Sequence, residues 1–273
     1  MSPSTPSEAS RTGAFAFPGE AAFTWDPVPW PGLRRMIADR RALADAEDRV
    51  AGGGALVPRM AWWTWEQPTI SVGQLQRKAS VIPLGVAVVR RPTGGRAILH
   101  DGEWTYSALV PRDHPRLGGS LDASTRAIVS VVASALETAY GIVVDPRPGP
   151  AAPVASPDWA KAGEACFVRT LGYELAVGGR KLMGSAQRRD RVTLLQQGSL
   201  LVGPGHERLA RHLGAGPDEE AALAARAVTL TELLGHAPDP EPFRRALAAA
   251  WTSAASGVCE AKAAVLDSAK GRT

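Results

Sequence analysis

The sequence predicts an α+β fold with a mixed, largely antiparallel β-sheet flanked by helices. Three observations predict it: strand-like segments dominate the middle of the chain, one long helix is inserted among them, and helices gather towards the carboxyl end. The regular alternation of strand and helix that marks a doubly wound sheet is absent. We therefore expect a sheet that helices cover mainly on one face.

The first half of the chain is predicted to begin with a helix over residues 30–50, which follows Pro31 and carries apolar residues roughly on one face. Strands are expected at 60–65, 69–72, 85–89 and 103–110. The clearest helix covers residues 122–140, because Ser120 or Asp122 can cap its start and Gly141 can end it.

The second half is predicted to begin with a loop or linker rich in proline and alanine. Further strand-like pieces lie at 165–169, 173–177, 181–185 and 194–202. From Pro217 the chain reads as helical, in two amphipathic units at 219–234 and 240–256. We expect a loose tail over residues 1–22 and a single domain over 23–273, whose part from about 217 to 273 is helical.

Composition indicates a globular protein of the cytoplasm. Of the 273 residues, 45% are hydrophobic and 21% are charged, which allows one large core or two modest ones. No apolar run approaches the roughly 20 residues that cross a bilayer, so we expect no membrane partner. The first twenty residues lack the basic start and the apolar run of a secretory signal.

Charge and metal-binding residue types exclude two further classes of function. The net charge is +4 and the pI is near 9.4, but no basic stripe with interleaved aromatic residues appears, so we expect no nucleic-acid partner. A mildly basic surface suits an acidic carrier protein. The two cysteines and five scattered histidines lack metal-ligand spacing, so no metal is expected.

Three segments could carry chemistry, and the first is RRPTGGRAILHD at residues 90–101. Its two glycines allow a backbone to approach a ligand closely, and arginines on both sides could hold a polar group. On pattern alone a hairpin turn with a charged rim is the favoured interpretation.

The second segment is GRKLMGSAQRR at residues 179–189. Strand alternation predicts that Lys181, Met183 and Ser185 share a face. An inward lysine needs a partner because burying an ammonium alone is costly. On pattern alone the favoured interpretation is a surface lysine that protects an edge strand.

The third segment contains Cys166. A lone cysteine is more often a small buried hydrophobic residue than a nucleophile, and Cys259 fits that description. Cys166 differs because it follows a flexible loop and opens a strand-like piece, where a thiol could face a cleft.

Taken together, these segments resemble the superfamily of lipoate–protein ligases and octanoyltransferases, which also includes biotin–protein ligases. Residues 90–107 resemble its Arg-Arg-x-x-Gly-Gly-x-x-x-x-His-Asp block and the Tyr-Ser strand after it. Residues 179–189 resemble its Lys-x-x-Gly-Ser/Asn-Ala-Gln-Arg block, and residues 194–202 its Leu-Gln-His-Gly-Ser strand. Arg96, and Cys166 ahead of Gly-Tyr-Glu-Leu, are most similar to the cysteine-dependent octanoyltransferases that act with an acyl carrier protein.

The resemblance implies a biotin/lipoate-ligase-like catalytic fold and a covalent transfer. Octanoyl–acyl carrier protein would give its acyl group to Cys166, and a lysine of a target domain would then take it. The targets would be lipoyl domains of 2-oxoacid dehydrogenase complexes or the glycine cleavage H protein. No tightly bound cofactor is implied. A free thiol has a pKa of about 8.5, and Lys181 is the resembling residue that would favour its thiolate, contact the acyl carbonyl or serve as the base.

The substrate-binding residues are likewise carried over from the resembling blocks. Gly94 and Gly95 would form a wall of the acyl slot, and His100 would either orient groups at its mouth or have a structural role. The full substrate-binding set is Arg91, Gly94, Gly95, Arg96, His100, Tyr106, Ser107, Met183, Gly184, Ser185 and Ala186.

Three alternatives remain open from sequence. An ATP-dependent lipoate–protein ligase would form lipoyl-adenylate and would not need Cys166. An amidotransferase of the same fold would move an acyl group between lipoyl domains. A non-catalytic acyl-binding module would leave Cys166 inert.

Overall fold

The computed structural model describes residues 22–76, 81, 84–145 and 174–256. Cys166, Cys259 and the strand-like piece at 165–169 lie outside the described residues, as does the predicted tail except for Ala22. The strands are β1 (Ala22–Trp25), β2 (Arg59–Trp63), β3 (Thr69–Val72), β4 (Ala87–Arg90), β5 (Ile98–His100), β6 (Glu103–Pro111), β7 (Leu175–Val177), β8 (Arg180–Arg189) and β9 (Thr193–Leu201). The helices are α2 (Gly32–Ala51), α3 (Leu121–Tyr140), the 3₁₀ turn η5 (His206–Arg208), α4 (Leu209–His212), α5 (Pro217–Arg226), α6 (Leu230–Leu234) and α7 (Pro240–Ala255).

The strands form two sheets, which confirms the predicted α+β fold with mixed, mainly antiparallel pairing. The larger sheet has the order β1-β2-β6-β9-β8-β7, in which only β1 and β2 run parallel. The smaller has the order β4-β3-β5, with a parallel and an antiparallel pair. Short connections join two of the antiparallel pairs of this sheet, β7–β8 and β8–β9.

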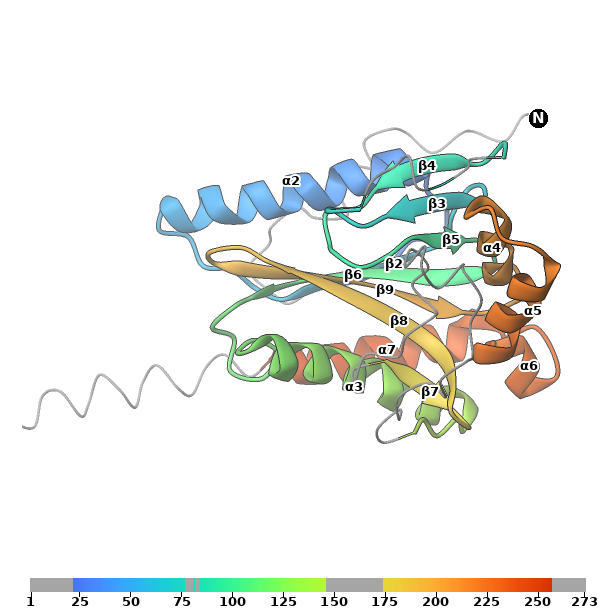
Figure 1. The fold of residues 1–273 in the computed structure, drawn as a ribbon. Helices are drawn as coiled ribbons and strands as arrows, with labels where there is room; N and C mark the ends of the chain where they lie inside the picture. The colour runs from blue at the N-terminus through green and yellow to red at the C-terminus, as the bar shows by residue number, and fades with distance from the viewer. Residues whose placement is uncertain (1–21, 77–80, 82–83, 146–173, 257–273) are drawn as a thin grey trace, which may run out of the picture.

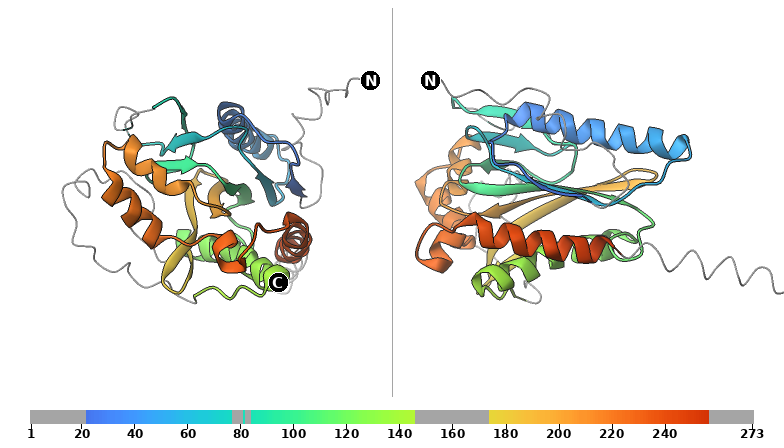
Figure 2. Two further views of the ribbon diagram at one scale, coloured as in Figure 1. Left: turned by 90° about the vertical axis from the view of Figure 1, so that its right-hand side faces the viewer. Right: turned by 180° about the vertical axis from the view of Figure 1, so that it is seen from behind.

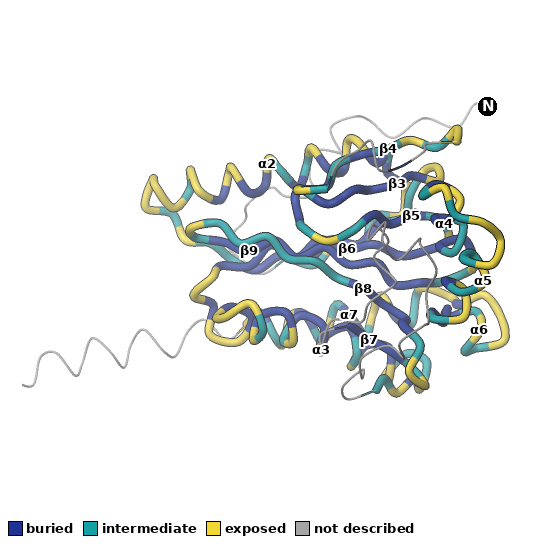
Figure 3. The backbone as a smooth tube through the Cα atoms, viewed as in Figure 1, coloured by how far each residue is buried: buried dark blue, intermediate teal, exposed yellow. Residues whose placement is uncertain are grey.

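Both faces of the larger sheet are covered, in contrast to the predicted cover mainly on one face. Helices α3 and α7 pack together on one face, while α2 and the smaller sheet lie on the other (Figures 1 and 2). The reason is visible in β6 and β9, which are buried along their whole length and therefore need cover on both sides (Figure 3).

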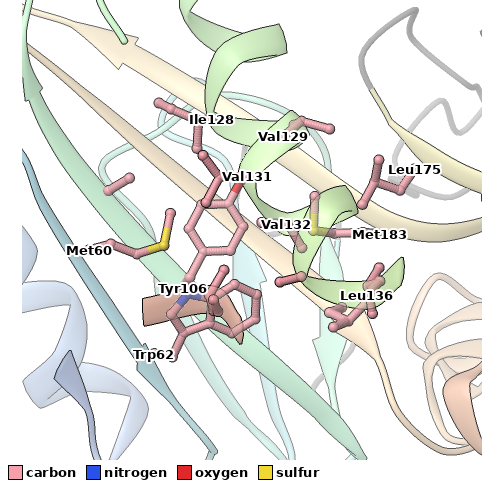
Figure 4. Packing of buried hydrophobic residues seen from close by; sticks show 14 of the residues in the cluster. Met60, Trp62, Tyr106, Ile128, Val129, Val131, Val132, Leu136, Leu175 and Met183 are labelled. Atoms are coloured by element: carbon pink, nitrogen blue, oxygen red, sulfur yellow. The ribbon is translucent and has the colours of Figure 1, made fainter. Parts of the chain in front are cut away.

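The main hydrophobic core lies between the larger sheet and the α3–α7 pair. Trp62 and Tyr106 stack with ring centroids 4.9 Å apart, and Met183 lies beside α3 in the same cluster as Val132 and Leu136 (Figure 4). Helix α3 begins where the Ser120 side chain accepts a hydrogen bond from the Ala123 backbone N–H, as predicted.

The predicted amphipathic unit at 219–234 is two helices, α5 and α6. The break lies at Ala227–Thr229, where the Val228 backbone N–H donates to the Lys181 carbonyl at 3.0 Å. A tertiary hydrogen bond therefore overrides the helical periodicity, and it ties β8 to the helical segment. Among the described helices, none combines the length and the apolar character that crossing a membrane requires.

Candidate active site

A pocket lies where the two sheets and α2 meet, and it brings together residues from all of the predicted binding blocks. Its space is about 20 Å³, room for about one water molecule, so an alkyl chain enters only if the walls move apart. It is lined by Met36, Trp65, Ser71, Arg91, Ile98, His100, Thr105, Gly184, Ser185, Ala186, Gln197, Gly198 and Ser199.

The Gly-Gly loop is not a hairpin turn, because β4 and β5 both pair with β3 and not with each other. The buried Arg91 side chain holds this loop from inside. Its guanidinium donates to the Gly94 carbonyl at 2.7 and 3.0 Å and to the Arg96 carbonyl at 2.7 Å. Its third nitrogen donates to the carbonyl and the hydroxyl of Ser71, at 2.9 and 3.0 Å. Because a guanidinium presents several N–H donors in fixed directions, Arg91 fixes the backbone conformation of the Gly-Gly loop.

Glycine is required in this region because two segments of the chain approach each other closely. A Cβ atom on Gly73 would lie 2.0 Å from the Gly95 carbonyl oxygen, so two chain segments touch here. Gly95 has a φ of +84°, which few other residues adopt. Gly94, by contrast, has no atom within 4 Å of the place where a Cβ would sit, so the space beside it is open. Neither Gly94 nor Gly95 is among the residues that line the pocket, although both were expected to form a wall of the acyl slot.

Lys181 is buried, and its amine forms an ion pair with the carboxylate of Glu174, also buried. A Cβ on Gly184 would lie 2.8 Å from Lys181 Cε and 3.0 Å from Nζ, so the amine lies beside the pocket-lining backbone of Gly184. The surface lysine that the strand pattern alone favours is therefore wrong. The lysine is inward and has the partner that burial requires, but the sequence did not identify that partner as Glu174.

The expected shared face of Lys181, Met183 and Ser185 is not observed. The pairing of β7 with β8 shifts register between Leu175 and Ala176, which leaves an extra residue on β8. Such a bulge breaks the alternation. Met183 consequently packs in the main core, whereas Lys181 reaches back over Gly184 on the opposite face.

His100 is fixed by a chain of hydrogen bonds. Its Nδ1 lies 2.5 Å from Glu103 Oε1, and its Nε2 lies 2.7 Å from Ser71 Oγ. Arg91 can only donate to the Ser71 hydroxyl, so that hydroxyl is free to donate its own proton to His100 Nε2. His100 Nδ1–H then donates to the Glu103 carboxylate, and each of these groups has a partner. The ring also stacks on Trp65 with centroids 3.9 Å apart. His100 thus forms a rigid wall of the pocket.

A second buried network, centred on Asp39 of α2, was missed by the sequence analysis. Its carboxylate accepts from Arg35 at 3.0 Å, from Ser107 at 2.7 Å and from Gln197 at 2.6 Å. Gln197 accepts in turn from Thr93 of the Gly-Gly loop at 2.7 Å. The signal was an acid at the i+3 position from Met36 on the apolar face of the predicted helix, where a charge needs partners.

Tyr106 and Met183 lie in the main core and do not line the pocket. The Tyr106 ring lies against Gly198, where a Cβ would come within 2.2 Å of it, and its hydroxyl accepts from Gln196 at 2.8 Å. Burial raises the pKa of Tyr106 above its ordinary value, so this phenol stays neutral. Arg96 and Ser107 are not among the residues that line the pocket: the Arg96 carbonyl accepts from Arg91, and the Ser107 hydroxyl donates to Asp39.

This arrangement suits acyl chemistry, because a buried amine lies at the edge of an apolar pocket with glycine backbone beside it. Over the described ranges, no group of three or more His, Cys, Asp or Glu side chains is placed to hold a metal ion.

Comparison with known proteins gives a consistent result. The family described as the lipoyl protein ligase A/B catalytic domain matches residues 49–252. The octanoyltransferase LipM of Kyrpidia tusciae is 34% identical over 219 residues, which cover 74% of this chain and 77% of that protein. The octanoyltransferase LipM of Symbiobacterium thermophilum is 34% identical over 240 residues, 82% of each chain.

Solved structures share the fold at lower identity. A lipoate protein ligase of T. acidophilum superposes with a TM-score of 0.60 at 18% identity, covering 86% of this chain and 85% of its own. A lipoate-protein ligase A bound with ATP gives 0.59 at 20% identity, with 86% and 85% covered. A bi-partite lipoate protein ligase of Thermoplasma acidophilum, described with its E2 lipoyl domain, gives 0.57 at 19%, with 86% and 83% covered.

Proposed function

The chain belongs to the family of lipoyl protein ligase A/B catalytic domains, and from that premise we propose that it transfers octanoyl groups in protein lipoylation. The donor is octanoyl–acyl carrier protein, the covalent carrier is Cys166, and the acceptor is a lysine of a lipoyl domain. The observation that carries this proposal is the Lys181–Glu174 pair beside Gly184 at the edge of the apolar pocket. Cys166 stands eight positions before Glu174 in the sequence.

In the first step the Cys166 thiolate attacks the donor carbonyl carbon. A C–S bond to the enzyme forms, the C–S bond to the carrier breaks, and the carrier thiolate takes up the proton that Cys166 released. Thioester exchange needs no ATP, since the bond broken and the bond formed are of the same kind. The Lys181 ammonium favours the attacking thiolate, because a nearby positive charge stabilises the anion.

In the second step the amine of the target lysine attacks the Cys166 thioester. The C–N bond forms, the Cys166 thiolate leaves, and the proton lost by the amine returns to the sulfur. The developing oxyanion needs donors, and the Lys181 amine with the backbone N–H groups near Gly184 and Ser185 can supply them.

Two related activities are separated from this one by their requirements. A lipoate–protein ligase would need ATP, release AMP and keep its activity in Cys166→Ala. An amidotransferase would also use Cys166, but it would take the acyl group from an octanoylated lipoyl domain and not from acyl carrier protein. A non-catalytic acyl-binding protein would bind octanoate without forming an adduct.

The test is to incubate the protein with octanoyl–acyl carrier protein, without ATP, and to measure its intact mass. We expect an octanoyl adduct that hydroxylamine removes and that is absent in Cys166→Ala. Cys259→Ala is the matched control and should be labelled like the wild type. ATP-dependent modification of a lipoyl domain without any adduct would instead establish the ligase.

A further inference from the structure

A cluster of arginines lies at the end of the larger sheet, away from the pocket. The segments 111–116 and 188–193 together contain five arginines against two aspartates. The fold brings them together, because Pro111 of β6 pairs with Thr193 of β9, and the Arg112 backbone N–H donates to the Val192 carbonyl at 3.0 Å. This end of the sheet is the β8–β9 hairpin at the left of Figure 1.

Four members of this cluster lack a carboxylate partner among the described residues: Arg112, Arg116, Arg189 and Arg191. Arg112 donates to the Asp190 carbonyl at 3.1 Å, and Arg116 to the Ser253 carbonyl at 2.7 Å, so both side chains are held without being neutralised. By comparison, Arg188 pairs with Asp190 at 3.0 Å. Arg112, Arg116 and Arg191 are exposed, so their positive charge faces solvent. Arg189 is half-buried and donates to the Gly119 carbonyl and to Gln187 Oε1, so it is held without being neutralised.

The charges of Arg112 and Arg189 repel each other. The pKa of the Arg189 guanidinium is lowered below its ordinary value, mainly by burial and secondarily by the positive charge of Arg112. Uncompensated like charges destabilise a folded protein slightly, and they attract an oppositely charged partner. A cluster of this kind raises the rate of association with an acidic protein.

We infer that these four arginines dock the acidic carrier protein that brings the octanoyl thioester. This inference rests on the proposed function and names the surface that the donor uses. The occupant is a small acidic protein with its acyl group on a phosphopantetheine arm, since guanidinium groups bind both carboxylates and phosphates.

The distance along β8 favours the donor over the acceptor. Arg189 lies five positions after Gly184, which is beside the Lys181 amine, and five positions span roughly 17 Å in an extended strand. A lipoyl domain reaches the site only with a lysine side chain, so it must sit directly at the pocket. A phosphopantetheine arm is several times longer, so its carrier can bind the cluster while the thioester reaches the pocket.

The experiment compares a protein donor with a small donor. In Arg112→Glu and Arg191→Glu, alone and combined, initial rates are measured with octanoyl–acyl carrier protein and with octanoyl-pantetheine. We expect KM for the protein donor to rise about tenfold in the double variant, with kcat and the small-donor rate changed by less than about twofold. Added KCl should raise the wild-type KM and should affect the double variant less.

The matched control is Arg41→Glu, which reverses an exposed charge on α2. It should leave the KM for the protein donor unchanged. The inference is overturned if this control raises KM as much as Arg112→Glu, or if the cluster variants raise KM for the lipoyl-domain acceptor and not for the donor.

Binding of acyl carrier protein without an acyl group, followed by fluorescence anisotropy in Cys166→Ala, tests the surface without any transfer. If the cluster variants weaken this binding but the wild type forms no octanoyl adduct, the proposed chemistry fails and the docking surface stands. If the cluster variants bind the carrier protein normally and the wild type forms the adduct, the docking surface is ruled out and the proposed chemistry stands.

Discussion

The amine of Lys181 forms a buried ion pair with the carboxylate of Glu174, and both lie beside the bare Cα of Gly184. Each charge would be costly in the interior without the other. The two residues that follow Lys181, Leu182 and Met183, are buried in the main hydrophobic core. They anchor β8 to the core beside Lys181. The Lys181 amine is therefore held by the Glu174 carboxylate, and its backbone is held by the packing of β8.

Replacement of Glu174 by Gln should slow acyl transfer and destabilise the protein. Glutamine keeps the shape but removes the negative charge that pairs with the Lys181 amine, and breaking a buried pair costs about 3–5 kcal/mol. Urea unfolding should show a loss of about that size, and the rate of octanoyl transfer should fall in the same variant.

The neighbouring residue on β8 supplies the control for that experiment. Arg180 pairs with Glu232 across the surface, where both side chains are largely exposed. Glu232→Gln should therefore cost less than about 1 kcal/mol and leave transfer unchanged. Equal effects of the two substitutions would show that the buried pair has no special role.

This pair shows how far the sequence alone could reach. The role of Lys181 at the site was suggested by the resemblance of its block to a known one, whereas its strand pattern alone favoured a surface position. The partner of Lys181 was not predictable, since Glu174 precedes the strand by one residue and a one-residue register shift places it next to the amine. Bulges change which residues face each other, and alternation alone does not reveal them.

Gly184→Ala should displace the Lys181 side chain without unfolding the protein. The new methyl group would lie 2.8 Å from Lys181 Cε, and the far end of a lysine can move to avoid it. We expect octanoyl transfer to fall about tenfold or more, since a small misplacement of a catalytic group has a large effect on rate. Thermal unfolding should change little.

Gly203→Ala is the control, because the nearest atom to its added Cβ lies 4.0 Å away. Transfer at the wild-type rate in Gly184→Ala, with Gly203→Ala also unaffected, would remove Lys181 from the mechanism.

Thr93→Val tests whether the Gly-Gly loop is held by the network of α2. The substitution keeps the side-chain shape and removes the hydrogen bond from Thr93 Oγ1 to Gln197 Oε1. We expect a loss of about 1 kcal/mol in unfolding free energy and a higher KM for the octanoyl donor, with kcat less affected. A change in kcat alone would mean that the network acts on Lys181 and not on the pocket.

The same network marks the limit of prediction for the pocket. The glycines and Arg91 were identified from their block, but their roles come from contacts between segments far apart in sequence, such as Gly73 with Gly95. The buried position of Asp39 on α2 had a local signal, its place on the apolar face near Met36, but its partners had none. Long-range hydrogen bonds, such as that between Asp39 and Gln197, have no local signal.

Acid should destabilise the protein through His114. Burial lowers the pKa of this histidine below its ordinary value, while Nδ1 accepts the Leu117 backbone N–H at 3.0 Å and Nε2 lies 3.2 Å from the Ala255 carbonyl. A neutral ring satisfies both contacts, so the folded state binds its proton less readily than the unfolded chain does. The stability is therefore fully present above the unfolded pKa of about 6.5 and is lost as pH falls through the lower folded pKa.

The measurement is the unfolding free energy at a series of pH values, for the wild type and for His114→Gln. Each proton bound on unfolding contributes a slope of at most about 1.4 kcal/mol per pH unit. Protonation of carboxylates also lowers the unfolding free energy at low pH, but it does so in both proteins. The difference between the two slopes therefore isolates the contribution of His114. Parallel curves would show that this histidine does not titrate with unfolding, and that the contact between the loop after β6 and the end of α7 does not depend on its neutral form.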